Sequence, residues 1–304
     1  MTEQASRFEV DVCICTFHRP SLLDTLESLA GQDFGRDRFR VIVADNASES
    51  TIREDVEQAA ARLGLNLQYV HAPERNISVA RNACLDQVTA PLAAFLDDDE
   101  LASPQWLSSL AARREATGAD IVFGPVDGVY GPTAPEWMRR ARLHDVRPTF
   151  LEGDRVENGY MGNALIRSDC LAGQRFLVAL GRTGGEDTVF FAGLARAGIT
   201  MVYAQDAVVS EPVPNSRERL QWLLSRSFRS GQTHGRVLLS GPGGDTVGSR
   251  VGNAAISALK SAYLLITAAV SLWDPGRWRR ALVRATLHLG VIWYMVGASE
   301  IELY

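Results

Sequence analysis

Apolar runs and helix-spaced apolar positions alternate along the first part of the chain. Apolar runs that end in polar residues predict strands, and the amphipathic segments between them predict helices. The predicted strands are 8–16, 39–44, 67–71, 91–96 and 119–124, and the predicted helices are 21–31, 51–63, 78–88 and 104–117. This strict alternation predicts an α/β fold with a Rossmann-like, mostly parallel sheet flanked by helices.

The pattern becomes less regular after residue 126. Short apolar runs are separated by Gly, Pro and Asp up to residue 214, with a predicted helix at 188–197 and a predicted strand at 200–209. The stretch 239–252 is rich in Gly and Ser and is predicted to be a linker or loop. We therefore predict a main domain over 1–238 and a C-terminal apolar helical region over 239–304.

Two apolar segments, 254–272 and 281–297, follow the predicted linker, and the sequence WDPGRWRR lies between them. Three interpretations stay open: core helices or a homodimer interface, a membrane-spanning hairpin, and amphipathic helices lying on a membrane. Tryptophan and arginine between two apolar segments are typical of an anchor at an anionic membrane surface, which we favour.

Charge is distributed unevenly along the chain. Residues 215–284 contain eleven basic and three acidic residues, a net charge of +8. Because the whole chain carries −5 and the last twenty residues carry −2, residues 1–214 carry −11. An acidic body with a basic region predicts an anionic partner. The apolar neighbours of these charges favour a membrane surface over a nucleic acid, and we predict no nucleic-acid partner.

Composition and cysteine spacing indicate an ordinary globular protein of a reducing compartment. Hydrophobic residues make up 46% and charged residues 22% of the chain. The four cysteines form no CxxC pair. Cys13 and Cys15 are two residues apart and therefore lie on the same face of a predicted strand, as expected for buried thiols. The N-terminus lacks the basic and apolar regions of a secretion signal. We therefore expect a cytoplasmic protein on the inner face of a bacterial plasma membrane.

The strongest chemical signal is the acidic run Asp97, Asp98, Asp99 and Glu100, directly after a predicted strand. Adjacent carboxylates repel one another unless a cation lies among them. Oxygen ligands at a strand end suit Mg²⁺ or Mn²⁺ shared with the phosphates of a substrate. An acidic turn that caps the next helix explains these four residues equally well.

Four further motifs follow predicted strands or open predicted helices. They are TFHRP at 16–20, DNAS at 45–48, RNISVARN at 75–82 and GGED at 184–187. Each has a plain structural explanation, such as an Asx turn, a helix cap or a solvated helix start. Each also suits a nucleotide-dependent enzyme, because hydroxyl and guanidinium groups bind phosphates and a carboxylate can act as a general base.

Taken in this order, the motifs resemble those of family 2 glycosyltransferases, which have the GT-A nucleotide-sugar fold. The resemblance covers roughly residues 8–235, and the stretch YMGNAL at 160–165 resembles bacterial exopolysaccharide glucosyltransferases of the succinoglycan type. It implies an inverting transfer from a UDP-sugar to a hydroxyl of a glycan acceptor, with UDP-glucose as the favoured donor. That acceptor is expected to be linked to a polyprenyl diphosphate.

The resemblance also implies a role for each matching residue. Asp187 would be the catalytic base, with Glu186 supporting it or contacting the acceptor. The donor-binding set would be Thr16, Arg19, Asp45, Arg81, Asp97, Asp98, Arg226 and Arg229, with Asp45 on the uracil. Asp99 would ligate the metal, with Asp97 and His234 as further candidates. The family's QxxRW-like element is altered to QWLLSR here, so Arg226, Arg229 and His234 stay alternatives for the diphosphate contact.

Three other functions are weighed against this one. A non-catalytic nucleotide-sugar-binding component of a polysaccharide assembly complex would lack the base or the metal residues, and both are present. A nucleotidyltransferase would show a Gly-rich basic loop after the first strand, which TFHRP does not supply. A nucleic-acid binder would show aromatic and basic residues interleaved on a recognisable module, which the basic region lacks.

Overall fold

The computed structural model describes residues 7–241 and 243–298, and these group into two compact units. The first unit comprises residues 1–127, 146–182 and 190–211, and the second comprises 128–145, 183–189 and 212–304, as far as these are described. The contacts place the segment after residue 212 with the C-terminal helices. A boundary at 238–239 between separately folding domains stays a prediction.

A seven-stranded sheet forms the centre of the first unit. Its order is β11 (Met201–Tyr203), β6 (Ile121–Phe123), β10 (Asn163–Arg167), β4 (Leu92–Asp97), β1 (Val10–Thr16), β2 (Phe39–Asp45) and β3 (Leu67–His71). Strands β4, β1, β2 and β3 pair in parallel, as do β11 and β6, whereas β10 is antiparallel to both of its neighbours. The predicted mostly parallel sheet is therefore confirmed.

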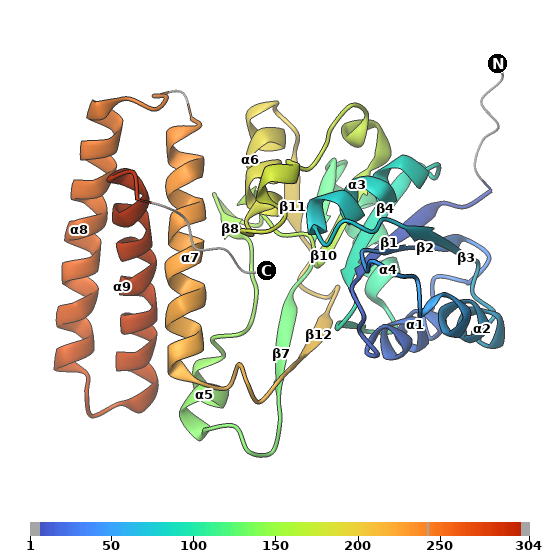
Figure 1. Cartoon of the computed structure of the whole chain (residues 1–304), viewed down its shortest axis with the longest axis horizontal. Helices are drawn as coiled ribbons and strands as arrows, with labels where there is room; N and C mark the ends of the chain where they lie inside the picture. The colour runs from blue at the N-terminus through green and yellow to red at the C-terminus, as the bar shows by residue number, and fades with distance from the viewer. Residues whose placement is uncertain (1–6, 242, 299–304) are drawn as a thin grey trace. The chain divides into compact units, whose positions relative to one another are not determined.

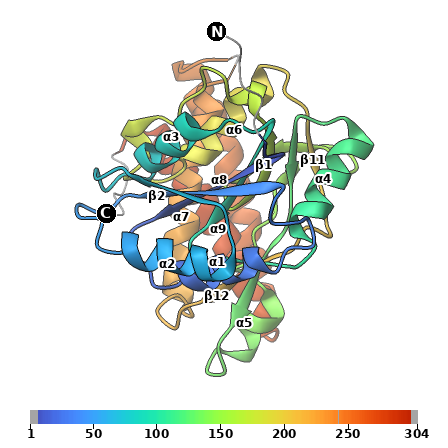
Figure 2. The same cartoon turned by 90° about the vertical axis from the view of Figure 1, so that its right-hand side faces the viewer.

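Helices cover both faces of this sheet. On one face pack α1 (Leu22–Ala30), α2 (Arg53–Leu63) and α4 (Trp106–Thr117); on the other pack α3 (Ile77–Gln87) and the part of α6 (Glu186–Arg196) from Phe190 onward. Figures 1 and 2 show α1 and α2 below the sheet and α3 above it. Alternation along β1 explains the two layers, because Val12 and Ile14 face one core and Cys13 and Cys15 the other.

Short elements complete the description. The remaining strands are β5 (Leu101–Ala102), β7 (Val126–Tyr130), β8 (Thr149–Phe150), β9 (Val156–Asn158) and β12 (Val209–Val213), and 3₁₀-helices span Ser168–Leu171 and Val178–Leu180. Strands β7 and β12 both run along the chain from the first unit into the second. All four cysteines are buried and free, as predicted.

Three long helices dominate the second unit: α7 (Leu220–Leu239), α8 (Val247–Val270) and α9 (Pro275–Met295). Helix α9 lies between α7 and α8 and also contacts the short helix α5 (Glu136–Ala141) (Figure 1). Glycines allow α7 and α9 to approach at backbone distance. A Cβ atom on Gly290 would lie 1.9 Å from the Phe228 carbonyl oxygen, and one on Gly231 would lie 1.9 Å from that of Leu287.

Parts of the C-terminal half differ from the prediction. The expected linker over 239–252 is shorter, because α8 begins at Val247, where the Thr246 hydroxyl accepts a hydrogen bond from the Ser249 amide. The expected strand over 200–209 is split into β11 and β12, with residues between them outside any strand. Helix α9 begins at Pro275, before the apolar pattern starts, because Asp274 caps it and proline suits the first turn.

Candidate functional site

Three predicted site residues end neighbouring strands of the first unit. Asp45 ends β2 opposite Thr16 at the end of β1, and Asp97 ends β4 opposite Cys15. Parallel strands present their carboxyl ends at one edge of a sheet, where ligands of such folds bind. The structure thus brings Thr16, Asp45 and Asp97 to one edge, as the strand pattern predicts.

The acidic run makes a turn at this edge, and two arginines approach it. Arg19 donates a hydrogen bond to Asp99 and its Nε lies 3.6 Å from Asp98 Oδ1. Arg81, on α3, points an Nη atom to within 3.9 Å of Asp97 Oδ1 and lies over the Phe176 ring. The motifs around Arg19 and Arg81 are therefore part of the same site as the acidic run.

Burial makes this turn electrostatically unusual. Asp98 is 6% exposed, and this burial raises its pKa to about 6, although the charge of Arg19 acts to lower it. Glu100 is 3% exposed, and burial raises its pKa well above the usual range, with the charge of Asp97 adding to the rise. Carboxyl groups that are costly to ionise together are suited to receive positive charge from a ligand.

Glu100 is a site residue whose role the sequence does not reveal. Its Oε2 accepts a hydrogen bond from the Asp97 amide at 2.8 Å, so it supports the acidic turn from beneath. Gly162 leaves the space for it, because a Cβ there would lie 2.6 Å from Glu100 Oε1. The glycine of the YMGNAL stretch is therefore the sequence signal that pairs with this buried glutamate.

Asn163, the next residue of that stretch, connects three segments in the interior of the first unit. Its Nδ2 donates to the carbonyl oxygens of Pro125 and Ala207 at 2.9 and 2.8 Å, and its Oδ1 accepts from Trp106 Nε1 at 2.8 Å. Asn163 is fully buried. Its role is to hold strand β10 and its neighbours in place next to the acidic turn.

Asp45 is fully buried and held in a fixed orientation. Its Oδ1 accepts a hydrogen bond from the Ala47 amide at 2.9 Å, and its Oδ2 accepts one from the Tyr69 hydroxyl. Burial raises the pKa of Tyr69, and its hydrogen bond to Asp45 raises it further, so the phenol stays protonated and donates. A fixed, buried carboxylate at a strand end is suited to accept a hydrogen bond from a nucleobase.

The RNISVARN motif at 75–82 divides into structural and site residues. Asn76 caps α3 and donates to the Val178 carbonyl at 2.9 Å, and Asn82 exchanges hydrogen bonds with the Phe176 backbone. Ser78 donates to the Leu177 carbonyl at 3.0 Å. These residues fix the segment 176–181 over α3, whereas Arg81 is directed to the acidic turn.

The GGED motif begins helix α6 in the second unit. Gly184 and Gly185 have φ angles of 83° and 81°, which only glycine adopts readily in succession. Asp187 Oδ1 accepts hydrogen bonds from the amide and hydroxyl of Thr188 at 2.6 and 3.2 Å, and Glu186 is 6% exposed. The candidate base is therefore oriented by the first turn of its own helix.

Helix α7 packs against this motif. A Cβ on Gly185 would lie 2.3 Å from Thr233 Cγ2, so the glycine permits direct contact with the helix. Arg226, Arg229 and Thr233 follow at spacings of three and four residues, which places them on one face of α7. The two candidate diphosphate-binding arginines therefore share the helix face that the GGED loop contacts.

Two predicted residues of α7 have other neighbours as well. Arg226 lies over the Trp222 ring, its guanidinium carbon 5.3 Å from the ring centroid. His234 is exposed, and its charge joins those of Lys260 and Arg284 in lowering the pKa of His288, after the larger effect of burial. His234 therefore has cationic neighbours, and its role as a metal ligand stays a prediction.

The predicted ligands of a divalent metal, Asp97 and Asp99, lie in the acidic turn. Within the described part of the chain, no group of three or more His, Cys, Asp or Glu side chains is arranged to hold a metal ion. Mg²⁺ and Mn²⁺ are commonly bound by one or two carboxylates together with substrate phosphates. Asp97 and Asp99 supply such carboxylates, so the residues fit a metal shared with a bound diphosphate.

Comparison with known proteins identifies relatives over nearly the whole chain and over part of it. It is 45% identical over 298 residues to the succinoglycan biosynthesis protein ExoM of Rhizobium meliloti, covering 97% of this chain and 95% of that protein. It is 37% identical over 128 residues to validoxylamine A glucosyltransferase of Streptomyces hygroscopicus, covering 41% of this chain and 30% of that protein.

Solved structures of low sequence identity share the fold. Residues 1–349 of Staphylococcus aureus TarS, crystallised with UDP-GlcNAc, match with a TM-score of 0.55 and 14% identity over 96% of this chain and 93% of that one. The mannosyltransferase PcManGT of Pyrobaculum calidifontis, in complex with GDP-Man and Mn²⁺, matches with a TM-score of 0.61 and 19% identity over 94% and 86%.

The model of one protein family matches residues 11–178, which include the strand-end motifs of the first unit. This span contains Thr16, Asp45, Arg81 and the acidic turn. Together with the near full-length similarity to ExoM, the match shows that the chain belongs to glycosyl transferase family 2.

Proposed function

We propose that this protein is an inverting glycosyltransferase that moves a sugar from a UDP-sugar to a hydroxyl of a lipid-linked glycan in exopolysaccharide synthesis. UDP-glucose is the favoured donor. The observation that carries the proposal is the convergence of Thr16, Asp45 and the acidic turn at one sheet edge. The succinoglycan biosynthesis protein ExoM, similar over nearly its full length, supports the choice of pathway.

The first unit would bind the donor. Asp45, fixed by Tyr69 and Ala47, would accept a hydrogen bond from the uracil. Thr16 and Arg19 would line the nucleotide pocket, and Asp97 and Asp98 would reach the ribose and the sugar. Arg81 would lie near the diphosphate or the sugar. Arg226 and Arg229 of α7 would supply further positive charge to the diphosphate, since guanidinium groups bind phosphate oxygens with two parallel hydrogen bonds.

A divalent metal, held by Asp99 with Asp97 and with His234 as a further candidate, would act as a Lewis acid that neutralises charge on the leaving diphosphate. Mn²⁺ is present with GDP-Man in the solved structure of PcManGT, which supports this choice. Arg19 pairs with Asp98 and Asp99.

Transfer would proceed by a single displacement in which Asp187 is the general base. Both of its hydrogen bonds from Thr188 use Oδ1, so we assign Oδ2 to the acceptor hydroxyl. The proton passes from the acceptor hydroxyl to Asp187 as the hydroxyl oxygen bonds to the anomeric carbon. The bond from that carbon to the diphosphate breaks on the opposite face and UDP leaves, so the anomeric configuration is inverted. Buried Glu186 would support the base or contact the acceptor.

Helix α8 would hold the enzyme on the inner face of the plasma membrane, where a polyprenyl-diphosphate-linked acceptor is found. Among the described residues, α8 is the one helix that is long and apolar enough to cross a membrane, which by itself is weak evidence. Leu259, Tyr263 and Ile266 are 74%, 70% and 64% exposed on it. Large exposed apolar patches mark interaction surfaces, and the arginines and tryptophans after α8 favour lipid over a second copy of the chain.

The test is calorimetric binding of UDP, GDP and ADP, each with Mn²⁺ and with EDTA. Metal-dependent binding of UDP alone is expected, and Asp99→Ala should abolish the metal dependence. Asp45→Asn should weaken UDP binding, whereas the matched control Asp55→Asn, on the exposed side of α2, should not. Absence of metal-dependent binding of any nucleotide would overturn the proposed function.

A further inference from the structure

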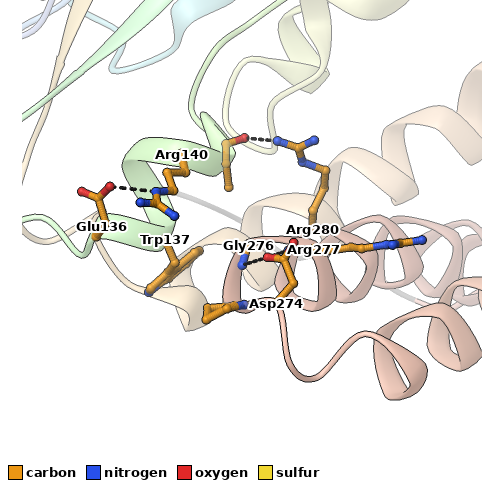
Figure 3. A pocket seen from close by; sticks show the side chains of 9 residues that line it. Glu136, Trp137, Arg140, Asp274, Gly276, Arg277 and Arg280 are labelled. Carbon is orange, nitrogen blue, oxygen red and sulfur yellow. Dashed lines mark hydrogen bonds and ion pairs between the residues drawn. The ribbon is translucent and has the colours of Figure 1, made fainter.

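A cavity of about 710 Å³ opens between α5 and the beginning of α9, wholly within the second unit. Helix α5 contributes Trp137 and Arg140 to its lining, and α9 contributes Arg277 and Arg280. These residues are separated by more than a hundred positions in the sequence, and Figure 3 shows them around one space. None of them is part of the donor or base machinery proposed above.

The lining is rich in guanidinium groups that its two carboxylates neutralise only in part. Asp274 Oδ1 accepts hydrogen bonds from the amides of Gly276 and Arg277 at 2.9 and 3.0 Å, so this carboxylate serves as the cap of α9. Glu136 pairs with Arg140 at 2.9 Å, and both side chains are largely exposed, so solvent screens the pair. Because Asp274 already satisfies these amides, an anion in the cavity would be bound by arginine side chains.

Arg280 holds the two walls of the cavity together. Its Nη2 donates to the Ala141 carbonyl, at the end of α5, at 2.8 Å (Figure 3). Arg279, next to it, lies over the rings of Trp137 and Trp278 at 4.7 and 4.1 Å. Arg280 is thus held in place before any ligand arrives, which lowers the entropy cost of its binding an anion.

The exposed apolar face of α8 leads directly to this cavity. After the end of α8 at Val270, the exposed apolar surface continues with Leu272 and Trp273, which are 64% and 76% exposed and immediately precede the cavity residue Asp274. A molecule with long apolar chains along α8 would place its polar end beside Arg277. Guanidinium groups suit the planar oxygen pairs of phosphate, and tryptophan lies at the headgroup depth of membranes.

We propose that this cavity binds a lipid-borne phosphate. This proposal rests on the proposed membrane association of α8. Two sources share this chemistry: the phosphodiester of an acidic phospholipid and the diphosphate of a polyprenyl carrier. The site would fix how the second unit is oriented on the membrane, because it adds a point contact to the sliding surface that α8 offers.

The test compares vesicle binding of the full-length protein with that of R140Q/R277Q, which leaves the Arg280 contact intact. The matched control R62Q/R175Q removes the same charge from exposed positions of the first unit. Co-sedimentation would be measured with phosphatidylcholine vesicles alone, with added phosphatidylglycerol, and with added undecaprenyl diphosphate. Calorimetric UDP binding and thermal melting would show that each variant is folded.

R140Q/R277Q is expected to bind vesicles that contain phosphatidylglycerol or undecaprenyl diphosphate about tenfold more weakly than the wild type, with the control unchanged. The vesicle type on which the difference is larger identifies the source of the phosphate. Equal binding of the two double variants to every vesicle type would overturn the proposal. To separate this from failure of α8 to bind membranes, the variants would also be titrated with two soluble probes, dihexanoyl phosphatidylglycerol and a short-chain polyprenyl diphosphate. Equal affinity of the two double variants for both probes, or no binding of either probe by the wild type, would overturn the phosphate site on its own.

Discussion

The carboxyl edge of the central sheet and helix α8 depart in opposite directions from the usual pattern of buried apolar and exposed charged side chains. At the sheet edge, charged groups such as Asp98 and Glu100 are buried, where they cost stability unless a partner compensates them. On α8, apolar side chains such as Leu259 and Ile266 are exposed, where they gain nothing from water. In the proposed function each region takes the ligand that suits its residues, a polar, phosphorylated donor at the sheet edge and lipid at α8.

The largest effect is expected when chemistry is separated from donor binding. Asp187→Asn should lower the transfer rate about a thousandfold, because an amide cannot take the acceptor proton. UDP binding should stay close to that of the wild type, since the residues proposed to bind the nucleotide, Asp45 and the acidic turn, belong to the first unit. Radiolabelled sugar transfer and calorimetry measure the two properties. A variant with full transfer activity would remove Asp187 from the mechanism.

A second substitution tests whether polar groups in the sheet region are essential to its stability. Asn163→Ala should lower the free energy of unfolding by about 3 kcal/mol or more, because it leaves Trp106, Pro125 and Ala207 without their buried hydrogen-bond partner. Its counterpart on α8, Asn253→Ala, should be neutral or slightly stabilising, since alanine favours helix. Urea unfolding measures both, and equal effects would contradict the contrast between the two regions.

The third prediction concerns pH. Burial of His144 lowers its pKa to about 4, with the charge of Arg226 lowering it further, while the Nε2 contact to the Arg217 carbonyl acts in the other direction. The unfolded chain then binds more protons than the folded one between pH 6.5 and 4. Stability should be fully present above pH 6.5 and fall as pH decreases, by at most about 1.4 kcal/mol per pH unit.

Carboxyl groups also titrate in this range, so the slope of the wild type must be compared with that of His144→Gln. The variant should show a shallower decline in unfolding free energy over the same pH window. Parallel curves would mean that His144 is not the source of the slope. Measurements of chemical unfolding at several pH values would supply both curves.

The smallest effect on stability is expected on α8. The double substitution Leu259→Asn and Ile266→Asn should change the free energy of unfolding by no more than about 1 kcal/mol, because both side chains face solvent. Partition to vesicles should nevertheless fall strongly. If the same change destabilises the protein by several kcal/mol, or alters its oligomeric mass in solution, the face of α8 is a protein interface and the homodimer is favoured.

Much of the sheet and its polar edge could be predicted from local pattern. Strand–helix alternation requires parallel pairing, and parallel pairing brings the ends of β1, β2 and β4 to one edge, which is why Thr16, Asp45 and Asp97 were identified together. The antiparallel insertion of β10 was not predicted, because strand order depends on contacts distant in sequence. The burial of Glu100 against Gly162 was not predicted for the same reason, because the two residues are distant in sequence.

The second unit was harder to predict. The sequence pattern does not predict helix α7, because the glycines at 231 and 235 interrupt the apolar spacing that helices usually show. The structure explains them by close approach to α9: a Cβ on Gly235 would lie 3.0 Å from Tyr294. The cavity between α5 and α9 combines distant residues that carry no shared local signal. The metal, the sugar donor and the role of His234 stay predictions.

Helix α8 is attached to the rest of its unit mainly through small residues on one side. Ser257, Ser261 and Ala268 face inward, and the Ser261 hydroxyl donates to the Ala285 carbonyl of α9 at 3.4 Å. Its outward side could therefore be rewritten as a unit, with these three residues kept, without touching the residues that perform transfer. If α8 binds the membrane as proposed, a polar redesign of this outward side would convert the enzyme into a freely diffusing catalyst for synthesising glycans in a test tube.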